Sequence, residues 1–374
     1  MQTPSFSIGI EEEYLIVDRA SRDLVRAPSE DFLADCGASL GKHLSPEFLQ
    51  CQVEVGTEVH RTAPEAGAEL RQMRRCISNA AQAHGYAAIA ASTHPFADWQ
   101  AQTHTRKERY DALEADLGAA VRRLLICGCH VHVGIEDPDL RIDLMNQAAY
   151  FLPHLLALST SSPFWKGDDT GLASYRLTVF DALPRTGLPD VFHSHAEYRR
   201  LVDHLVKAGC IEDATKIWWD IRPSVKFPTL EQRVTDVCSL VEDAVTVAAL
   251  YQGILAMLWR LRSMNQRWRV YPAIMINENR WRAQRYGTTR ELVDHGKDAL
   301  VPFLELLEEL IDLTAPASAD LGAQEAIARG REICARGTSA ERQRRCYDEA
   351  INQGADRQEA LRQVVDHLIE EFNA

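Results

Sequence analysis

The segment IGIEEEYLIVD, residues 8–18, alternates like a β-strand but contains three consecutive glutamates. Residues two apart in a strand lie on the same face. Glu11 and Glu13 are therefore predicted to share one face of a sheet, with Glu12 on the other. An isolated Glu-x-Glu pair is also typical of a solvent-facing edge strand, so this segment alone predicts either a site or a surface.

A second strand-like segment, ICGCHVHVGI at residues 126–135, repeats this spacing with imidazoles. His130 and His132 share a face, which is a usual way to present imidazoles to a metal or a phosphate, although such pairs are also structural. Cys127 and Cys129 have no second cysteine pair nearby, so we predict buried strand cysteines rather than a zinc site. The nine cysteines are odd in number and predict no disulfide framework.

The segment PTLEQRV, residues 228–234, places Glu231 and Arg233 two positions apart. On a strand these side chains would share a face. If Thr229 instead capped a helix, they would diverge by about 200° and could not act together. The sequence leaves both alternatives open.

The segment SPEFLQCQVEVGT, residues 45–57, contains Glu47 and Glu54. Glu54 lies between two valines and is predicted to be an inward carboxylate on a strand, which requires a partner such as a cation. Several glutamates with a histidine form a hard ligand set, suited to Mg²⁺ or Mn²⁺. Arginines could bind phosphates or a carboxylate bidentately, or pair with structural aspartates; the candidates are Arg176, Arg222 and Arg233.

Charge and hydropathy limit the partners of this 374-residue chain. Its formal net charge of -13 would repel nucleic acids and anionic membranes, so neither is expected. The N-terminus lacks a basic region followed by an apolar one, so no secretory signal is predicted and a cytoplasmic location is expected. The uncharged run at Ala244–Trp259 is shorter than the roughly 18 apolar residues of a spanning helix and is predicted to be a buried helix.

The order of elements predicts an α+β fold without a Gly-rich phosphate loop. We predict one domain over residues 1–374, mainly helical from about residue 300. Predicted helices include Pro64–His84, Asp139–Ser159, a segment capped by the box at Thr338–Glu341, and Arg357–Phe372. Predicted strands are Phe6–Val17, Cys51–Val55, Tyr86–Ala91, Leu124–Ile135, Ala173–Phe180 and Lys216–Lys226.

Taken together, these segments resemble the bacterial carboxylate-amine ligase family of glutamate–cysteine ligase type 2. The resemblance runs in order from Ser7 to Gly287 and also includes SSPFWKGDDTGLASYR, LPRTGLP, WWDIRPS and ENRWRAQRYG. It implies the fold of the glutamine synthetase-like superfamily, a curved, mainly antiparallel sheet that forms a funnel with helices packed outside.

The resemblance also implies roles for individual residues. His132 and Arg222 are assigned only to the substrate or phosphate pocket, and Glu12 is not expected to be a ligand. Arg233 would contact phosphate and Arg176 would hold a substrate group during transfer. The implied metal ligands are Glu11, Glu13, Glu47, Glu54, His130 and Glu231.

The activity implied by the resemblance is amide formation driven by ATP with Mg²⁺ or Mn²⁺. The γ-phosphoryl group would pass to a substrate carboxylate, and an amine would displace phosphate from the acyl phosphate. Glutamate and cysteine are the family's amino-acid pair. A phosphotransferase of the same superfamily and a non-catalytic nucleotide- or metal-binding protein are the alternatives. A homodimer is expected, because an uncovered sheet edge favours association.

Overall fold

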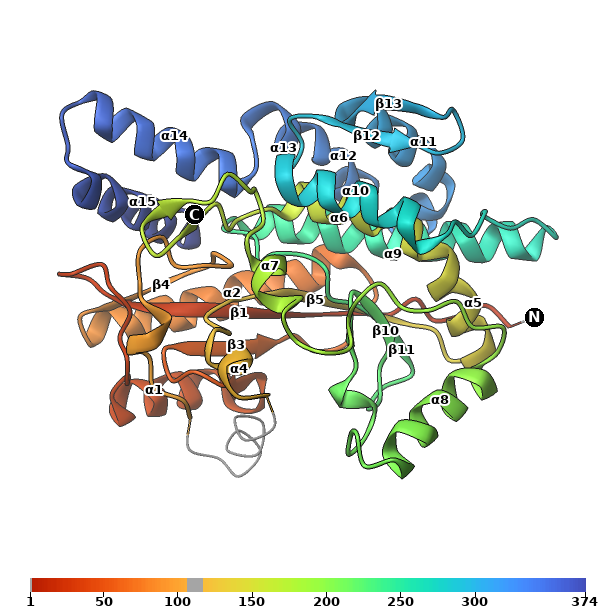
Figure 1. Cartoon of the computed structure of the whole chain (residues 1–374), viewed down its shortest axis with the longest axis horizontal. Helices are drawn as coiled ribbons and strands as arrows, with labels where there is room; N and C mark the ends of the chain where they lie inside the picture. Colours follow the sequence, from red (N-terminus) through yellow and green to blue (C-terminus); the bar gives the residue numbers. More distant parts are fainter. Residues whose placement is uncertain (1, 106–116) are drawn as a thin grey trace.

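The main element of the computed structural model, which describes residues 2–105 and 117–374, is a seven-stranded sheet (Figure 1). Its strand order is β10-β11-β5-β1-β3-β2, β4 also pairs with β1, and all these pairings are antiparallel. The α+β class and the mainly antiparallel sheet are therefore confirmed. The strands are β1 (Ile8–Asp18), β2 (Leu44–Pro46), β3 (Gln52–Gly56), β4 (Tyr86–Ile89), β5 (Cys129–Gly134), β10 (Ile221–Pro223) and β11 (Thr229–Gln232).

Strand β1 is the centre of this sheet because it pairs with three others. Ile8–Glu12 pair with β5, Glu11–Leu15 with β3, and Leu15–Asp18 with β4. Burial along β1 alternates from residue 8 to 14, with the even-numbered side chains buried and the odd-numbered residues partly exposed. The two faces of the sheet therefore differ in character, and the glutamates of the first segment are divided between them.

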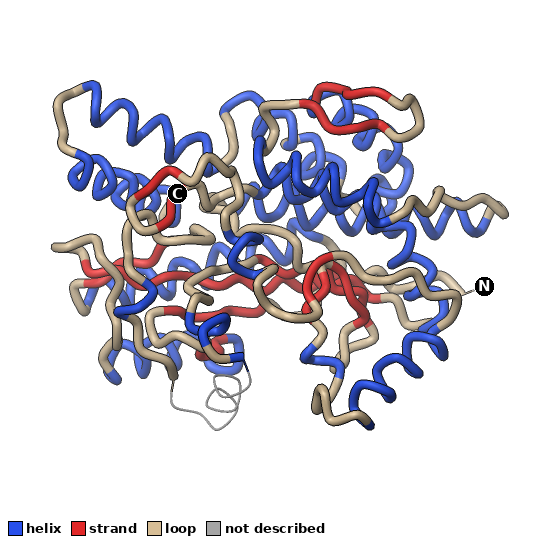
Figure 2. The backbone as a smooth tube through the Cα atoms, in the orientation of Figure 1, coloured by secondary structure: helices blue, strands red, loops and turns tan. Residues whose placement is uncertain are grey.

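Helices cover the apolar face of the sheet. α2 packs against β1 and β4, α9 packs against β5, and these two helices contact each other. Figure 2 shows the strands of the main sheet as one layer, with α9 and the helices that follow it on one side. The helices are α1 (Glu30–Leu40), α2 (Ala63–Ala83), α4 (Ala119–Arg122), α5 (Pro138–Ala148), α6 (Leu152–Ser159), α7 (Arg176–Phe180), α8 (His195–Lys207), α9 (Val241–Ser263), α10 (Ala273–Tyr286), α11 (Phe303–Asp320), α12 (Gln324–Ala328), α13 (Gly330–Arg336), α14 (Ser339–Asn352) and α15 (Arg357–Phe372).

Short strand pairs lie outside the main sheet, and the last part of the chain is helical. The pairs are β6 (Phe164–Trp165) with β7 (Asp168–Asp169), β8 (Thr186–Gly187) with β9 (Trp218–Trp219), and β12 (Glu291–Asp294) with β13 (Ala299–Pro302). From α11 onward the chain is mainly helical, as predicted. One buried apolar cluster includes residues as distant in sequence as Phe6 and Phe372. The organisation of the chain as a single domain stays a prediction.

Helix α9 contains the predicted buried run. The Tyr251 hydroxyl donates to the Leu230 carbonyl at 3.2 Å, and the Gln252 amide donates to the Phe6 carbonyl at 2.8 Å. Among the described helices, α9 alone is long and apolar enough to cross a membrane, but 83% of its most apolar window is buried inside the protein. The prediction of a core helix is confirmed.

A buried ion pair fixes the apolar face of β1 to α2. Glu12 and Arg74 are 0% and 1% exposed, and the Arg74 guanidinium donates to both Glu12 carboxylate oxygens at 2.7–3.0 Å. The Tyr14 hydroxyl also donates to Glu12 at 2.5 Å. Arg74 further donates to the carbonyls of Cys238 and Ser239 and lies 5.3 Å from the Phe372 ring. This network joins β1, α2, the segment before α9 and the end of α15.

One predicted strand, Ala173–Phe180, is wrong because this segment ends in helix α7. The hydroxyl of Ser162 accepts from the Arg176 backbone N–H at 3.1 Å, and Thr178 N–H donates to the Tyr175 carbonyl. Thr178 alone is exposed in the helix. A five-residue run of this kind fits one turn of a buried helix as well as a strand.

Other predicted boundaries are corrected in detail. The Leu124–Ile135 strand begins only at Cys129, and Lys216–Lys226 divides into β9 and β10. The long helix at Asp139–Ser159 is interrupted by a 3₁₀ turn before α6, near Pro153, which lacks a backbone donor.

Several local predictions are confirmed. Helix α15 covers Arg357–Phe372, and the capping box at Thr338 and Glu341 begins α14. The PTLEQRV segment forms β11, so the helix-cap alternative at Thr229 is wrong. All nine cysteines are free thiols, and Cys129 is a buried strand cysteine as predicted; Cys127 is also buried but lies before β5.

The Glu12–Arg74 pair generates a stability prediction. Arg74→Met leaves the Glu12 carboxylate buried without its cation, so the free energy of unfolding is expected to fall by about 3–5 kcal/mol. Urea denaturation measures this value. Arg75→Met, on the exposed neighbouring residue of the same helix, is the control and should change it by less than about 0.5 kcal/mol. A loss for Arg74→Met no greater than that of the control would contradict the prediction.

Candidate active site

Strand register brings the predicted polar side chains to the face of the sheet opposite α2. Directly paired residues of antiparallel strands project from the same face. Seven predicted residues gather there from five strands. The pairs are Glu54 with Glu13, Glu11 with His130, His132 with Glu231, and Glu231 with Arg222.

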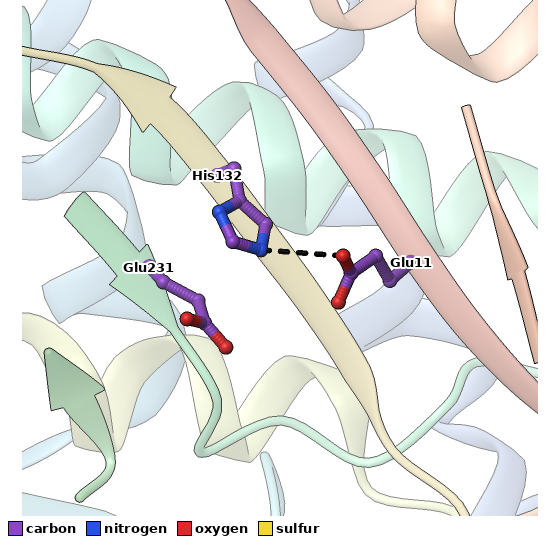
Figure 3. A group of neighbouring side chains, drawn as sticks. All are labelled: Glu11, His132 and Glu231. Atoms are coloured by element: carbon purple, nitrogen blue, oxygen red, sulfur yellow. Dashed lines mark ion pairs between the residues drawn. The ribbon is translucent and has the colours of Figure 1, made fainter. Parts of the chain in front are cut away.

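Glu11, His132 and Glu231 form a group that could hold a metal ion (Figure 3). One ligand atom from each lies within 4.8 Å of the others. His132 Nε2 is 3.5 Å from a Glu11 oxygen. The Thr229 hydroxyl is hydrogen-bonded to His132 Nδ1 at 2.9 Å, which leaves Nε2 as the ring nitrogen that faces the carboxylates.

The two histidines of β5 differ in their surroundings. His130 Nδ1 is also 3.5 Å from Glu11, but Arg233 lies beside it at 3.5 Å. Burial and the charge of Arg233 lower the pKa of His130 to about 4. Burial also acts to lower the pKa of His132, but its contacts with Glu11 and the charge of Glu231 raise it overall. Both histidines therefore lie beside Glu11, and His132 is the one that belongs to the group of Glu11, His132 and Glu231.

A second acidic group, Glu13, Glu47 and Glu54, adjoins the first. Burial and the charge of Glu47 raise the pKa of Glu13 to about 8, and the same two causes raise that of Glu54 well above its ordinary value. The Gly128 backbone N–H donates to Glu13 at 2.8 Å. These carboxylates therefore repel one another, and a bound cation would relieve that repulsion.

The donor set of the two groups fits a hard divalent cation. Mn²⁺ accepts both carboxylate oxygens and an imidazole as ligands. Mg²⁺ prefers oxygen ligands, so it would bind mainly to the carboxylates. Among the described residues, Nε2 of both His130 and His132 is buried without a hydrogen-bond partner. The metal-ligand roles of all six predicted residues stay predictions, with His132 added as a candidate.

Two arginines hold Glu231 in place. Arg222 donates to both its carboxylate oxygens, at 3.0 and 3.3 Å, and Arg233 contacts it as well. Although burial acts to raise the pKa of Glu231, Arg233 and Arg222 hold it well below its ordinary value. Arg222 is itself anchored by the carbonyls of Ile217 and Thr215. The Arg233 Nε atom is buried and has no partner among the described residues.

Arg176 reaches this face from helix α7 rather than from a strand. Its guanidinium donates to the Arg233 carbonyl at 3.2 Å, and its buried Nε has no partner in the described part of the chain. A Cβ atom at position 128 would lie 2.4 Å from an Arg176 nitrogen. Gly128 therefore admits the arginine beside Glu13.

Sequence reasoning missed Asp236, which organises the segment around Arg176. Its buried carboxylate accepts from the Ser161 N–H and from the hydroxyls of Ser162 and Ser174, each at 2.8 Å. Burial raises the pKa of Asp236. The residue lies two positions after the quoted segment PTLEQRV, but its partners are about 60–75 positions away, so no local pattern indicates it.

Comparisons with known proteins give a family match and a relative of similar length. The model of glutamate-cysteine ligase family 2 matches residues 7–367. A relative from Rhodospirillum rubrum, provisionally named glutamate–cysteine ligase 2, is 58% identical over 373 residues, which are 99% of this chain and 96% of the relative.

Solved structures agree in fold. A glutamate–cysteine ligase from Francisella tularensis, in complex with AMP, has a TM-score of 0.66 at 13% identity and covers 98% of this chain and 89% of its own. A bifunctional glutathione synthetase from Pasteurella multocida has a TM-score of 0.68 at 14% identity over 98% of this chain and 52% of its own. At these identities the likeness shows a common fold.

The crowding of the acidic groups predicts a trade between stability and ion binding. In EDTA, Glu47→Gln removes repulsion on Glu13 and Glu54, so the free energy of unfolding should rise by about 1 kcal/mol. With millimolar Mn²⁺ or Mg²⁺ the wild type should be the more stable of the two proteins, because ion binding stabilises it more than it stabilises Glu47→Gln. Urea titrations in both buffers measure this, with exposed Glu278→Gln as the control. The prediction would be contradicted if, in EDTA, the wild type were more stable than Glu47→Gln.

Proposed function

Because the chain belongs to glutamate-cysteine ligase family 2, we propose that this ATP-dependent carboxylate-amine ligase joins the γ-carboxylate of glutamate to the amine of a small amino acid such as cysteine. The observation that supports this most directly is the set of carboxylates, imidazoles and arginines that the register places on one face, from β3 to β10. Such a face suits phosphoryl transfer, which depends on positioning and on neutralising charge.

The proposed reaction has two steps. The substrate carboxylate attacks the γ-phosphorus of ATP, and ADP leaves with the bridging oxygen. The amine then attacks the acyl phosphate, and phosphate leaves as the amide forms. No side chain becomes covalently bonded in this scheme, which agrees with a site built from carboxylates and arginines.

The arginines are proposed to bind the anionic groups. Arg233 would donate to the transferring phosphoryl group through its unpartnered Nε, and Arg176 would hold the substrate carboxylate near Glu13 in the same way. Arg222 positions Glu231. Mg²⁺ or Mn²⁺, held by the glutamates and a histidine, would neutralise phosphate oxygens.

The substrates are identified by the products. Purified protein with Mg²⁺, ATP and a panel of amino-acid pairs is expected to release ADP and phosphate together with a new amide, seen by mass spectrometry. A phosphotransferase of the same superfamily would instead give a stable phosphorylated product. ATP consumption that gives no amide with any pair would count against the proposed substrates.

A homodimer also stays a prediction. The outer strands of the described sheet, β2, β4 and β10, have three, four and three residues, so they offer little edge for pairing. Light scattering after size-exclusion chromatography measures the state, and a monomer at micromolar concentration would contradict the prediction.

The first kinetic prediction concerns Arg233→Lys. A lysine keeps the charge but cannot reproduce the planar fork of donors. We expect kcat to fall by about 100-fold or more. Arg290→Lys, on an exposed arginine, is the control. Unchanged kinetics for Arg233→Lys would remove this residue from the phosphate contacts.

The second kinetic prediction concerns Glu231→Gln, which keeps the shape of the side chain but removes its charge. Turnover of ATP should fall by about 1,000-fold, because the metal and the two arginines lose the carboxylate that both would bind. Circular dichroism and thermal melting should show a folded protein, and exposed Glu278→Gln should be as active as the wild type. Wild-type ATP consumption by Glu231→Gln would exclude the metal role.

A further inference from the structure

Helix α10 contains most of the segment ENRWRAQRYG, and one of its arginines joins two segments that lead to the candidate active site. Arg280 is buried and makes four hydrogen bonds to two carboxylates. It donates to Asp220 at 2.6 and 3.1 Å and to Asp181 at 2.7 and 2.9 Å. Asp220 is buried as well, whereas Asp181 lies nearer the surface. The guanidinium therefore bridges two acidic side chains about 40 positions apart in the sequence.

Each of these carboxylates belongs to a segment that carries one of the candidate active-site arginines. Asp181 directly follows α7, the helix that begins with Arg176. The backbone carbonyl of Asp220 accepts from the Arg233 N–H at 2.7 Å. The Arg176 guanidinium in turn donates to the Arg233 carbonyl at 3.2 Å. Together with the bonds of Arg280, these contacts close a ring that passes through both arginines.

Gln284, one turn further along α10, holds the rest of the segment around α7. Its backbone carbonyl accepts from the N–H groups of Ala173 and Ser174, at 2.8 and 3.0 Å. Its side-chain amide donates to the Thr178 hydroxyl at 2.8 Å. Helix α10 thus contacts the segment that carries Arg176 both before and after that residue.

Helix α10 is itself fixed to its surroundings. It packs against α6. The Asn279 side chain donates to the Val293 carbonyl at 2.8 Å and accepts from the Val293 N–H at 2.6 Å. The helix can therefore act as a support against which α7 is held.

We propose that Arg280 is a positioning residue for the ligase reaction, which holds α7 and the Arg233 backbone at a fixed separation. This inference rests on the proposed function, in which Arg176 binds the substrate carboxylate and Arg233 the transferring phosphoryl group. The separation of these two arginines then sets the distance between the attacking oxygen and the phosphorus. Arg280 contacts neither group and acts through its two carboxylates.

The energetics of a buried ion pair favour this role over a purely stabilising one. Desolvation offsets most of the attraction, so such a pair adds little net stability compared with apolar groups. The planar fork of a guanidinium does, however, fix the direction and distance of the carboxylates that it binds. Without the fork, Asp181 and Asp220 would repel each other. A displacement of about 1 Å at reacting groups can cost about 100-fold in rate.

The test is Arg280→Lys, which keeps the positive charge but cannot bind both carboxylates through a planar fork. We expect kcat for amide formation to fall by about 10–100-fold. Calorimetric titration of the full chain with a non-hydrolysable ATP analogue and Mg²⁺ should give a Kd within about twofold of the wild-type value, at unchanged stoichiometry. Loss of folded protein would instead lower the stoichiometry in proportion to kcat.

The matched control is Arg282→Lys. Arg282 lies on the same helix, but its guanidinium donates to the Glu291 carbonyl of β12, at 2.7 Å. This substitution should change kcat by less than about twofold.

A double-mutant cycle examines whether Arg280 acts through Arg176. In a chain that already carries Arg176→Lys, adding Arg280→Lys should lower kcat by less than about threefold, because the arginine to be positioned is absent. A general structural role would instead make the two losses multiply, and that result would overturn the inference.

Other results separate this inference from the proposed function. If the wild type forms the amide and Arg280→Lys has the same kcat, the positioning role is wrong and the proposed function stands. A fall in stoichiometry that accounts for the whole loss of kcat would also overturn the inference. If the wild type forms no amide with any amino-acid pair, the proposed function and this inference fail together.

Discussion

The pairing of Glu12 with Arg74 decides which way the first strand faces, and the rest of the structure depends on that choice. A strand with three consecutive glutamates must turn at least one toward the helices. Arg74 binds that one bidentately and so leaves Glu11 and Glu13 on the other face. A register shift by one residue would bury two carboxylates and expose one. The ion pair thus excludes the alternative register, in addition to any contribution it makes to stability.

The open face of the sheet is divided electrostatically. Around Glu231, two arginines compensate the negative charge, and carboxyl pKa values are held low. Around Glu13 and Glu54, burial and mutual repulsion raise them. One region is therefore neutralised by the protein itself, whereas the other relies on what binds there. This asymmetry leaves the carboxylates around Glu13 and Glu54 with the greater need for a bound cation.

Strand alternation was enough to predict the faces of Glu11, Glu12, Glu13, His130 and His132, because a period of two is a local property. It could not place Arg176, since a short run of apolar residues fits a helical turn equally well. Nor could it indicate Asp236, whose serine partners are distant in sequence, or Thr229 as the partner of His132. Family resemblance supplied candidate roles for the arginines. The structure adds the contacts that orient them, with Gly128 making room for Arg176.

The central position of β1 has a consequence for the order in which the nascent chain can fold. Arg74 follows Glu12 by only 62 positions, so this one ion pair on the back of the sheet is available early. The strand that carries Glu231 begins at Thr229, roughly 200 residues after β1 ends. At about 5–20 residues per second, the ribosome needs about 10–40 s to supply it. Until then Glu11 faces neither Glu231 nor its arginines, so the front face can be completed only late in translation.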